Sequence, residues 1–314
     1  MSNDSSELIL HHYPQSPFSE KTRLILGHKR LEWRSVIIPV MMPKPDLLPL
    51  TGGYRKTPVL QVGADIYCDS ALIASVLEQR APEPSIHPAE SAGAAQLMAQ
   101  WADTTLFWTV VPYTIQPAGL AAIFAGAPSE VIKAFGEDRA ALTSGLHWPT
   151  VTDATAQLHT HLGWLEQRLA DGRAFLGGTQ VSIADFSVAH CIWFVKSAPP
   201  VVAILDAYPR LLAWHARVLA IGQGHPRELG SGEALAVAAS AKGHAPSRVE
   251  FGLGFDADEQ VTVSATDYGQ DPVTGRLVGL TRERVTLERR DDRAGLVHVH
   301  FPRLGFRITR GAGT

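Results

Sequence analysis

The chain has 314 residues, of which 45% are hydrophobic and 19% are charged, and its formal net charge is −3. A chain of this length folds as about two ordinary domains, and the low charged fraction excludes global disorder. The near-neutral balance gives no reason to expect nucleic acid or an anionic membrane as a partner. Two cysteines, Cys68 and Cys191, are too few for a disulfide scaffold or a four-cysteine zinc site. Residues 1–7 show no signal-peptide pattern, so a reducing cytoplasm is the expected location.

The first zone, residues 1–84, mixes strand and helix patterns and predicts an α/β domain. The expected order is β-α-β, an irregular stretch, and then β-β-α, with Gly63-Ala64-Asp65 as a hairpin turn. The segment 81–88 is rich in proline and reads as a linker. The strands are expected at 8–12, 33–38, 58–62 and 66–68, and the helices at 17–29 and 70–80.

The second zone, residues 90–223, is predicted to be all-helical because leucines recur at helical spacing between Leu158 and Leu169. Ser182 and Asp185 form a capping box in sequence, at the head of an apolar helix. The stretch from Thr104 to Ser129 has no charged residue and is long enough to cross a bilayer. Prolines break it, so a broken, buried helical segment is predicted in place of a membrane span.

The third zone, residues 248–314, follows a Gly- and Ala-rich linker at 224–247 and has a β texture. About five short strands predict a small β-domain, a barrel or rolled sheet, that folds independently and is dispensable for ligand binding. From Arg276 onward nine arginines face four acidic residues, a pattern interpreted as a solvated face. His298 and His300 share a strand face, but no third ligand is evident, so no metal site is predicted.

The most informative loop leaves the first strand, where Ser16 precedes Pro17 at the predicted start of a helix. Ser16 is therefore an expected N-cap, at a position where free backbone N–H groups and the helix dipole favour a negative charge. A thiolate bound there would be stabilised, and the Ser16 hydroxyl could donate a hydrogen bond to it. Taken alone, a Ser-Pro pair is more often an ordinary helix cap without chemistry. Tyr13 is the alternative hydroxyl in the same loop.

Two later segments complete a recognisable pattern. Lys56-Thr57-Pro58 and Cys68-Asp69-Ser70 follow Ser16-Pro17-Phe18 in an arrangement that resembles the thioredoxin-like N-terminal domain of the glutathione transferases, above all the tau and omega classes. Gly178 to Asp185 and the segment around Trp214 resemble the helical C-terminal domain of the same family. The resemblance covers about residues 7–221, and residues 248–314 lie outside it.

The resemblance implies roles for individual residues. Ser16, or alternatively Tyr13, would face the glutathione sulfur, and Thr57 with a cis Pro58 would pair with the backbone of the tripeptide. Asp69 with Ser70 would hold the γ-glutamyl end. The remaining expected contacts are Phe18 and Lys56 for glutathione, with Arg55 or Lys44 as alternatives to Lys56, and Trp108 and Tyr113 for the acceptor pocket.

The sequence therefore predicts a three-part enzyme, α/β then all-α then a small β-domain, with boundaries at 1–84, 90–223 and 248–314. Its expected activity is transfer of the glutathione thiolate to a small hydrophobic electrophile, without a metal, and the resemblance implies a homodimer. One alternative is a glutathione-dependent reductase or isomerase, against which the serine at position 16 argues. The other is a non-catalytic binding or regulatory protein that keeps the fold.

Overall fold

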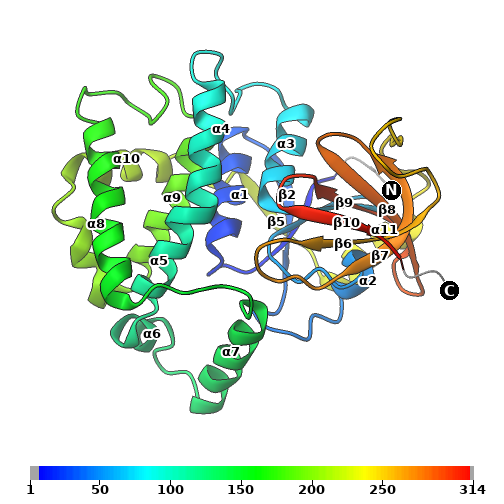
Figure 1. Ribbon diagram of the computed structural model, residues 1–314, viewed down its shortest axis with the longest axis horizontal. Coiled ribbons are helices and arrows are strands. Elements are labelled where there is room, and N and C mark those ends of the chain that lie inside the picture. Colours follow the sequence, from blue (N-terminus) through cyan, green and yellow to red (C-terminus); the bar gives the residue numbers. More distant parts are fainter. Residues whose placement is uncertain (1–6, 312–314) are drawn as a thin grey trace.

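A ten-stranded sheet in the order β10-β6-β7-β8-β9-β4-β3-β1-β2-β5 runs through the computed structural model, which describes residues 7–311 (Figure 1). The polar residues 1–6 considered above lie outside the described residues. The strands are β1 (Ile9–His12), β2 (Glu32–Ile37), β3 (Val59–Val62), β4 (Asp65–Cys68), β5 (His225–Glu228), β6 (Gln260–Ala265), β7 (Val273–Leu280), β8 (Arg284–Asp291), β9 (Gly295–Pro302) and β10 (Phe306–Arg310).

The N-terminal unit has the expected thioredoxin-like order. β1 runs parallel to β2 and antiparallel to β3, and β3 and β4 form the hairpin predicted around Gly63. The helices α1 (Pro17–His28) and α3 (Ser70–Arg80) follow β1 and β4, and the stretch expected to be irregular contains the single-turn helix α2 (Leu48–Thr51). Successive residues of β1 face opposite sides of the sheet, so that Leu10 joins the core under the helical domain and Ile9 joins a second core.

The helical domain packs on one side of this unit, with α1 and α3 between it and the sheet (Figure 1). The predicted capping box is present: Asp185 Oδ2 accepts from the Ser182 N–H at 2.8 Å, while Oδ1 accepts from the indole N–H of Trp214 at 2.8 Å. These bonds fix the start of α9 against α10. The helices are α4 (Ala92–Trp101), α5 (Phe107–Thr114), α6 (Pro117–Ile123), α7 (Ser129–Leu142), α8 (Val151–Arg168), α9 (Ile183–Lys196) and α10 (Pro209–Leu219), with a π-helical turn at Ala102–Leu106 and a 3-10 turn at Pro199–Leu205.

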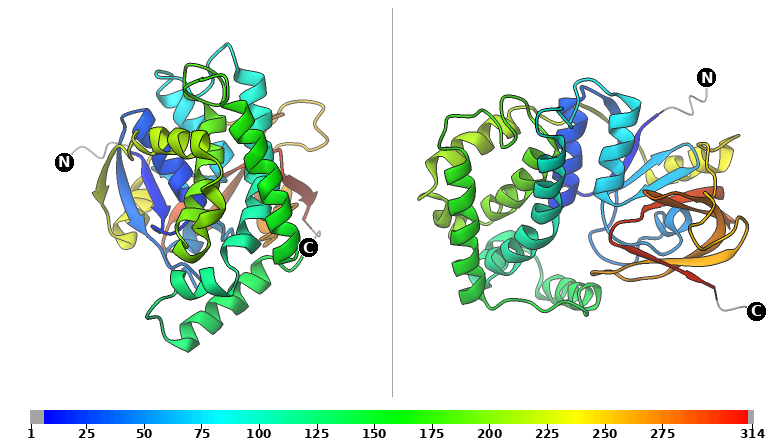
Figure 2. Two further views of the ribbon diagram at one scale, coloured as in Figure 1. Left: turned by 90° about the vertical axis from the view of Figure 1, so that its left-hand side faces the viewer. Right: turned by 45° about the horizontal axis from the view of Figure 1, so that its top comes forward.

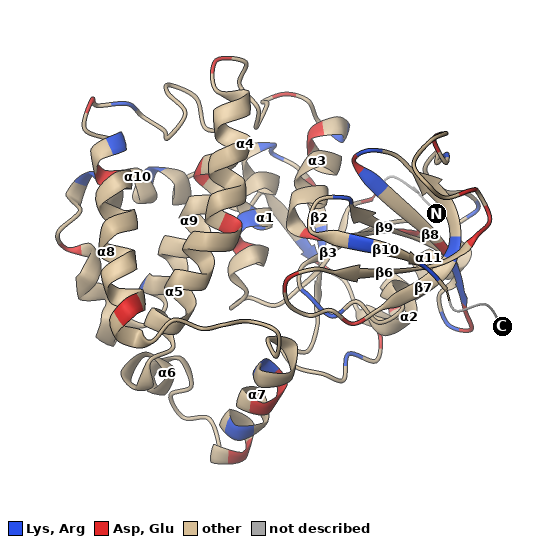
Figure 3. Ribbon diagram, viewed as in Figure 1, with Lys and Arg blue, Asp and Glu red and all other residues tan. Residues whose placement is uncertain are grey.

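The uncharged stretch from Thr104 forms α5 and α6, which carry no Lys, Arg, Asp or Glu (Figure 3). Much of α5 is buried in the core of the helical domain, as the broken-segment interpretation predicts, whereas α6 is buried only at Gly119. Among residues 7–311 no single helix is long and apolar enough to span a membrane. The segments Ala92–Thr114 and Pro117–Ile123 are long and apolar enough only when taken together, and a bend of 87° separates them.

The C-terminal strands differ from the expected separate barrel, because they continue the N-terminal sheet. β9 pairs parallel with β4, with Ile66 opposite Val299 and Tyr67 opposite His300. The segment predicted as a linker contains β5, which pairs parallel with β2, and helix α11 (Ser231–Ser240). Figure 2 shows the C-terminal strands on the side of the N-terminal unit opposite the helical domain.

A shared apolar core explains the continuity of the sheet. The second core contains Ile9 and Ile66 of the N-terminal strands together with Leu287, Val299 and Phe301 of the C-terminal strands. The alternating pattern of β9 was compatible with a strand that has one solvated face. In the structure both faces of β9 are covered: His300 is fully buried, and its ring stacks on that of Tyr67 in β4 with ring centroids 4.4 Å apart. The prediction of an independently folding segment is therefore wrong.

This shared core predicts that a cavity among the C-terminal strands destabilises the rest of the chain. Leu287 is fully buried, so Leu287→Ala should lower the free energy of unfolding by about 2–5 kcal/mol. All seven tryptophans lie before residue 248, so their fluorescence during urea unfolding reports the N-terminal and helical parts, with Trp108 also sensing its contact with Tyr268. The control Leu304→Ala, at a side chain 71% exposed, should change stability by no more than about 0.5 kcal/mol. An unshifted tryptophan transition in Leu287→Ala would contradict the shared core.

Candidate functional site

One row of the sheet brings the predicted site residues to a common edge. His11 of β1 lies opposite Val59 of β3, which in turn lies opposite Cys68 of β4. Because neighbouring strands in this row are antiparallel, the loop after β1, the segment before β3 and the loop after β4 all emerge on the same side. These three segments carry Ser16, Thr57-Pro58 and Asp69-Ser70.

Ser16 is the N-cap of α1, as predicted. Its side chain is buried, and Oγ accepts from the Ser19 N–H at 3.2 Å. Tyr13 hydrogen-bonds to the Ser16 side chain, and burial raises the pKa of its phenol above the ordinary value, so Tyr13 stays protonated at neutral pH. The two candidate hydroxyls thus occupy one place at the N-terminus of α1, where each could donate to an anion.

The peptide between Thr57 and Pro58 is cis, and it precedes the first ladder pair of β3 at Val59. Lys44 reaches it from the irregular segment and donates through Nζ to the Thr57 hydroxyl and the Arg55 carbonyl, both at 3.0 Å. Burial lowers the pKa of Lys44 to about 8. The backbone of Thr57 therefore lies beyond the sheet ladder, next to a desolvated lysine.

Asp69 is the N-cap of α3, and its carboxylate accepts from the Ala71 N–H at 2.8 Å. Its backbone has φ 78° and ψ 133°, a sparsely populated conformation for a residue with a side chain. Strained conformations of this kind concentrate at ligand sites. Burial raises the pKa of Asp69, although the nearby charges of Lys56 and Lys21 act in the opposite direction. Asp69 is thus a partly desolvated carboxylate at a helix N-terminus, and Ser70 beside it is buried.

The cations predicted for a ligand carboxylate already have protein partners. Lys56 Nζ donates to Asp267 Oδ1 at 2.6 Å and lies 3.9 Å from the centre of the Tyr268 ring. Arg55 pairs with Asp138 of α7. Neither pairing could be predicted from the sequence, because the partners lie in the helical domain and among the C-terminal strands.

The loop between β6 and β7, residues 266–272, supplies the partners of Lys56 and closes the site. Tyr268 packs edge-on against Trp108 of α5 with ring centroids 4.8 Å apart, and burial raises the pKa of its phenol well above 10. Tyr268 also lies within electrostatic range of Asp69 and Tyr13. Gly269 donates its N–H to the Leu142 carbonyl at 2.7 Å from a backbone with φ +55°, which suits glycine. The loop therefore bridges the N-terminal unit and the helical domain.

The two residues expected at the acceptor pocket lie in different parts of the helical domain. Trp108 lines a cavity of about 260 Å³, whose walls also include Thr104, Leu146 and Trp148. Tyr113 instead lies in the core, where its hydroxyl donates to the Val201 carbonyl at 2.8 Å.

Phe18 also faces the core of the helical domain. Its ring lies 4.6 Å from that of Phe107 and 4.7 Å from that of His190, so the structure directs it away from the sheet edge described above.

A buried charge cluster lies between the two domains, and it was not predicted from the sequence. Lys21 of α1 donates to Asp103 Oδ2 at 2.5 Å, and His190 Nε2 lies 3.1 Å from Asp103 Oδ1. Their local signal was weak: Asp103 is simply the last acidic residue before the uncharged stretch, and Lys21 lies within an amphipathic helix. The cluster fixes α1, and with it Ser16, against α9.

Arginines of the C-terminal strands are paired with carboxylates. Arg276 contacts Glu288 at 2.5 Å, Arg310 contacts Glu259 at 3.0 Å, and the Arg293 side chain reaches Asp46 at 2.5 Å. These three pairs compensate part of the arginine excess in this segment.

Comparison with known proteins extends the likeness over the whole chain. The model of the glutathione S-transferase N-terminal domain matches residues 10–85, and that of the C-terminal domain matches residues 138–217. A solved structure of a GST-like protein from Pseudomonas syringae is 43% identical, with a TM-score of 0.81, and the match covers 98% of this chain and 100% of that one. That match therefore takes in the C-terminal strands, which neither domain model reaches.

Two more distant similarities agree with this. FtsZ-localized protein A from Caulobacter vibrioides is 28% identical over 191 residues, which are 59% of this chain and 75% of that protein. A glutathione S-transferase from Rhodospirillum rubrum shares the fold at 24% identity and a TM-score of 0.52, over 68% of this chain and 88% of that one. On the two domain models and the full-length likeness to the Pseudomonas syringae protein, the chain belongs to the glutathione S-transferase family.

Proposed function

We propose that this protein binds glutathione at the sheet edge formed by Ser16, Thr57-Pro58 and Asp69-Ser70, and that it transfers the glutathione thiolate to a small hydrophobic electrophile. The observation that carries the proposal is the row His11–Val59–Cys68, which gathers these three segments at one edge. Two helix N-termini, those of α1 and α3, open at the same edge. Such an edge suits a ligand that carries a thiolate and a free carboxylate.

Each end of the ligand has a complementary group in this proposal. The carboxylate of Asp69 receives the γ-glutamyl ammonium group, and the N–H groups at the start of α3 receive the neighbouring carboxylate. The extended backbone at Thr57 pairs with the cysteinyl residue. The thiolate lies at the N-terminus of α1, where the hydroxyls of Ser16 and Tyr13 donate to it.

The chemistry needs only a stabilised thiolate. A free thiol has a pKa of about 8.5, so only a few per cent is ionised at neutral pH without help. Hydrogen bonds from Ser16 and Tyr13, together with the dipole of α1, favour the ionised form. The sulfur then attacks an electrophilic carbon, a C–S bond forms, and the leaving group departs with its electron pair. We place the acceptor beside Trp108, and we propose that the protein acts as a cytoplasmic homodimer.

Replacing Asp69 should weaken glutathione binding without removing the helix cap. Asp69→Asn keeps an N-cap side chain but loses the charge, so the dissociation constant from calorimetry should rise by roughly 10- to 150-fold, the equivalent of about 1.5–3 kcal/mol. Because burial raises the pKa of Asp69, wild-type affinity should also begin to fall at a higher pH on acidification than an exposed aspartate would allow. The control Asp206→Asn changes an exposed aspartate and should leave affinity unaltered. Equal affinities in both variants would remove Asp69 from the site.

Thiol–disulfide exchange should be weak in the natural protein and should appear in Ser16→Cys. Burial raises the pKa of both Cys68 and Cys191 well above 9, so neither should react with glutathione disulfide while the chain is folded. A thiol introduced at the N-terminus of α1 ionises readily and attacks disulfides. The rate of mixed-disulfide formation measures the difference, with urea-unfolded natural protein as the control for reactive thiols. Robust disulfide reduction by the natural protein would instead favour the reductase alternative.

A non-catalytic binding or regulatory protein is the second candidate function, and the pairing of Lys56 with Asp267 favours it. The carboxylate of Asp267 already occupies the cation that a glutathione carboxylate would need. The relative named FtsZ-localized protein A is consistent with a family member that acts by association with another protein.

The two candidates differ in what Asp267→Asn should do. If glutathione competes with Asp267 for Lys56, the variant should bind glutathione up to about fivefold more tightly, since a partly exposed ion pair is worth up to about 1 kcal/mol. Calorimetry and turnover of a generic electrophile measure both effects, and Asp271→Asn in the same loop is the matched control. Absence of binding and turnover in the natural protein and in both variants would favour the non-catalytic role.

A further inference from the structure

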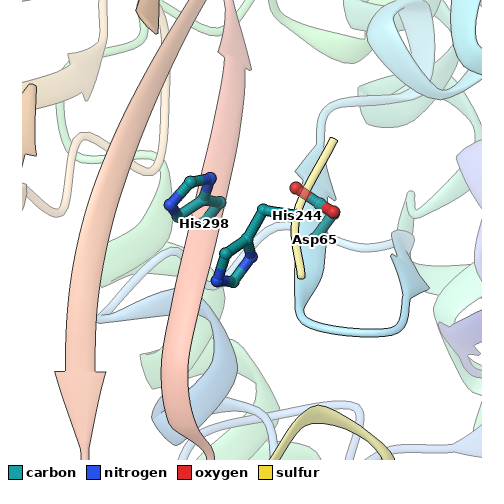
Figure 4. A group of neighbouring side chains, drawn as sticks. All are labelled: Asp65, His244 and His298. Atoms are coloured by element: carbon teal, nitrogen blue, oxygen red, sulfur yellow. The ribbon is translucent and has the colours of Figure 1, made fainter. Parts of the chain in front are cut away.

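The opposite end of β4 carries a second group of side chains, unrelated to the proposed glutathione edge. Asp65 at the start of β4, His244 between α11 and β6, and His298 of β9 come from three distant parts of the chain (Figure 4). The pairing of β4 with β9 sets Asp65 directly opposite His298. One potential ligand atom of each residue lies within 4.8 Å of the other two.

Each of the two histidines has a buried Nδ1 atom that makes no hydrogen bond within the described residues. His298 is only 8% exposed, its Nε2 faces Glu288 Oε2 at 3.6 Å, and its buried Nδ1 has no hydrogen-bond partner among the described residues. His244 likewise has a buried Nδ1 without a partner in the described part of the chain. A proton on Nε2 directed at Glu288 leaves the Nδ1 lone pair of His298 free, which is the form that binds metals.

Asp65 is held as an oriented carboxylate. Its Oδ1 accepts from His300 Nε2 at 2.7 Å, and its Oδ2 accepts from the Ala245 N–H at 2.7 Å. His300 is itself fixed by Thr286, whose hydroxyl lies 3.0 Å from Nδ1.

We propose that Asp65, His244 and His298 bind one divalent transition-metal ion, for which Zn²⁺ is the best match. Two imidazole nitrogens and one carboxylate oxygen are donors that Zn²⁺ prefers, and three protein ligands leave a fourth position for water. Glu288 and His300 act as outer partners that orient His298 and Asp65, a feature common around metal ligands.

One side chain must move to complete the set. The rings of His244 and His298 are stacked, with centroids 3.7 Å apart and planes 12° apart, whereas ligands of one ion point their lone pairs at a common centre. His298 is fixed on a central strand, but His244 is half-buried in the irregular segment after α11. The ring of His244 therefore turns out of the stack when the ion binds.

Equilibrium dialysis of the tag-free, EDTA-treated full chain against micromolar ZnCl₂, followed by metal analysis, tests the site. About one zinc per chain is expected, and His298→Ala and His244→Ala should each reduce it to background. The control His225→Ala removes an exposed histidine of β5 and should leave the stoichiometry unchanged. Because His244 lies outside the strands, its replacement tests the site even if His298→Ala fails to fold.

Spectroscopy and stability give independent readouts. Co²⁺ in place of Zn²⁺ should show visible absorption of a four-coordinate site in the natural protein and lose it in His244→Ala. Zinc should raise the melting temperature of the natural protein and of His225→Ala but not of His244→Ala, since an ion that binds only the folded state stabilises it. Failure to bind zinc, or retention of binding by both His244→Ala and His298→Ala, would overturn the proposal.

Discussion

The parallel pairing of β4 with β9 is the contact on which the other features of this structure depend. β4 would otherwise be an edge strand with unpaired backbone groups, and β9 satisfies them over the rows from Asp65 to Tyr67. The side chains of the joined strands then share one apolar core with the N-terminal unit. β8 pairs with β9, β7 with β8 and β6 with β7. The junction of β4 and β9 therefore also places the loop that contains Asp267 and Tyr268 beside Lys56.

Both candidate sites lie at the ends of the same short strand. Asp69 follows the last residue of β4, and Asp65 is its first residue, so their backbones are roughly 13 Å apart at the usual rise per residue. The edge proposed to bind glutathione is closed by a loop from the C-terminal strands, and the histidine cluster takes His298 from the same strands. The C-terminal segment therefore contributes residues to the candidate sites at both ends of β4, although it lies outside the part of the sequence that resembles the family.

Features that depend on neighbouring residues could be predicted from the sequence. The Ser16 cap, the hairpin at Gly63 and the capping box of Ser182 and Asp185 are each decided within a few positions of the chain. Contacts between distant segments could not, because Lys56 and Asp267 are 211 positions apart and either alone reads as a surface charge. The alternation in β9 was equally uninformative: a histidine facing solvent and one facing a buried aspartate produce the same pattern.

Covering β4 also changes how copies of this protein can meet. An uncovered β4 would offer a template on which a second chain could add a strand, but β9 occupies it. The sheet now ends at β5 and β10. β5 is four residues long, fully exposed and contains Pro226, while β10 presents Arg307 and Arg310 to solvent. The proline of β5 and the charged side chains of β10 discourage edge-to-edge growth, so extension of this sheet into a second copy of the chain is disfavoured at both ends.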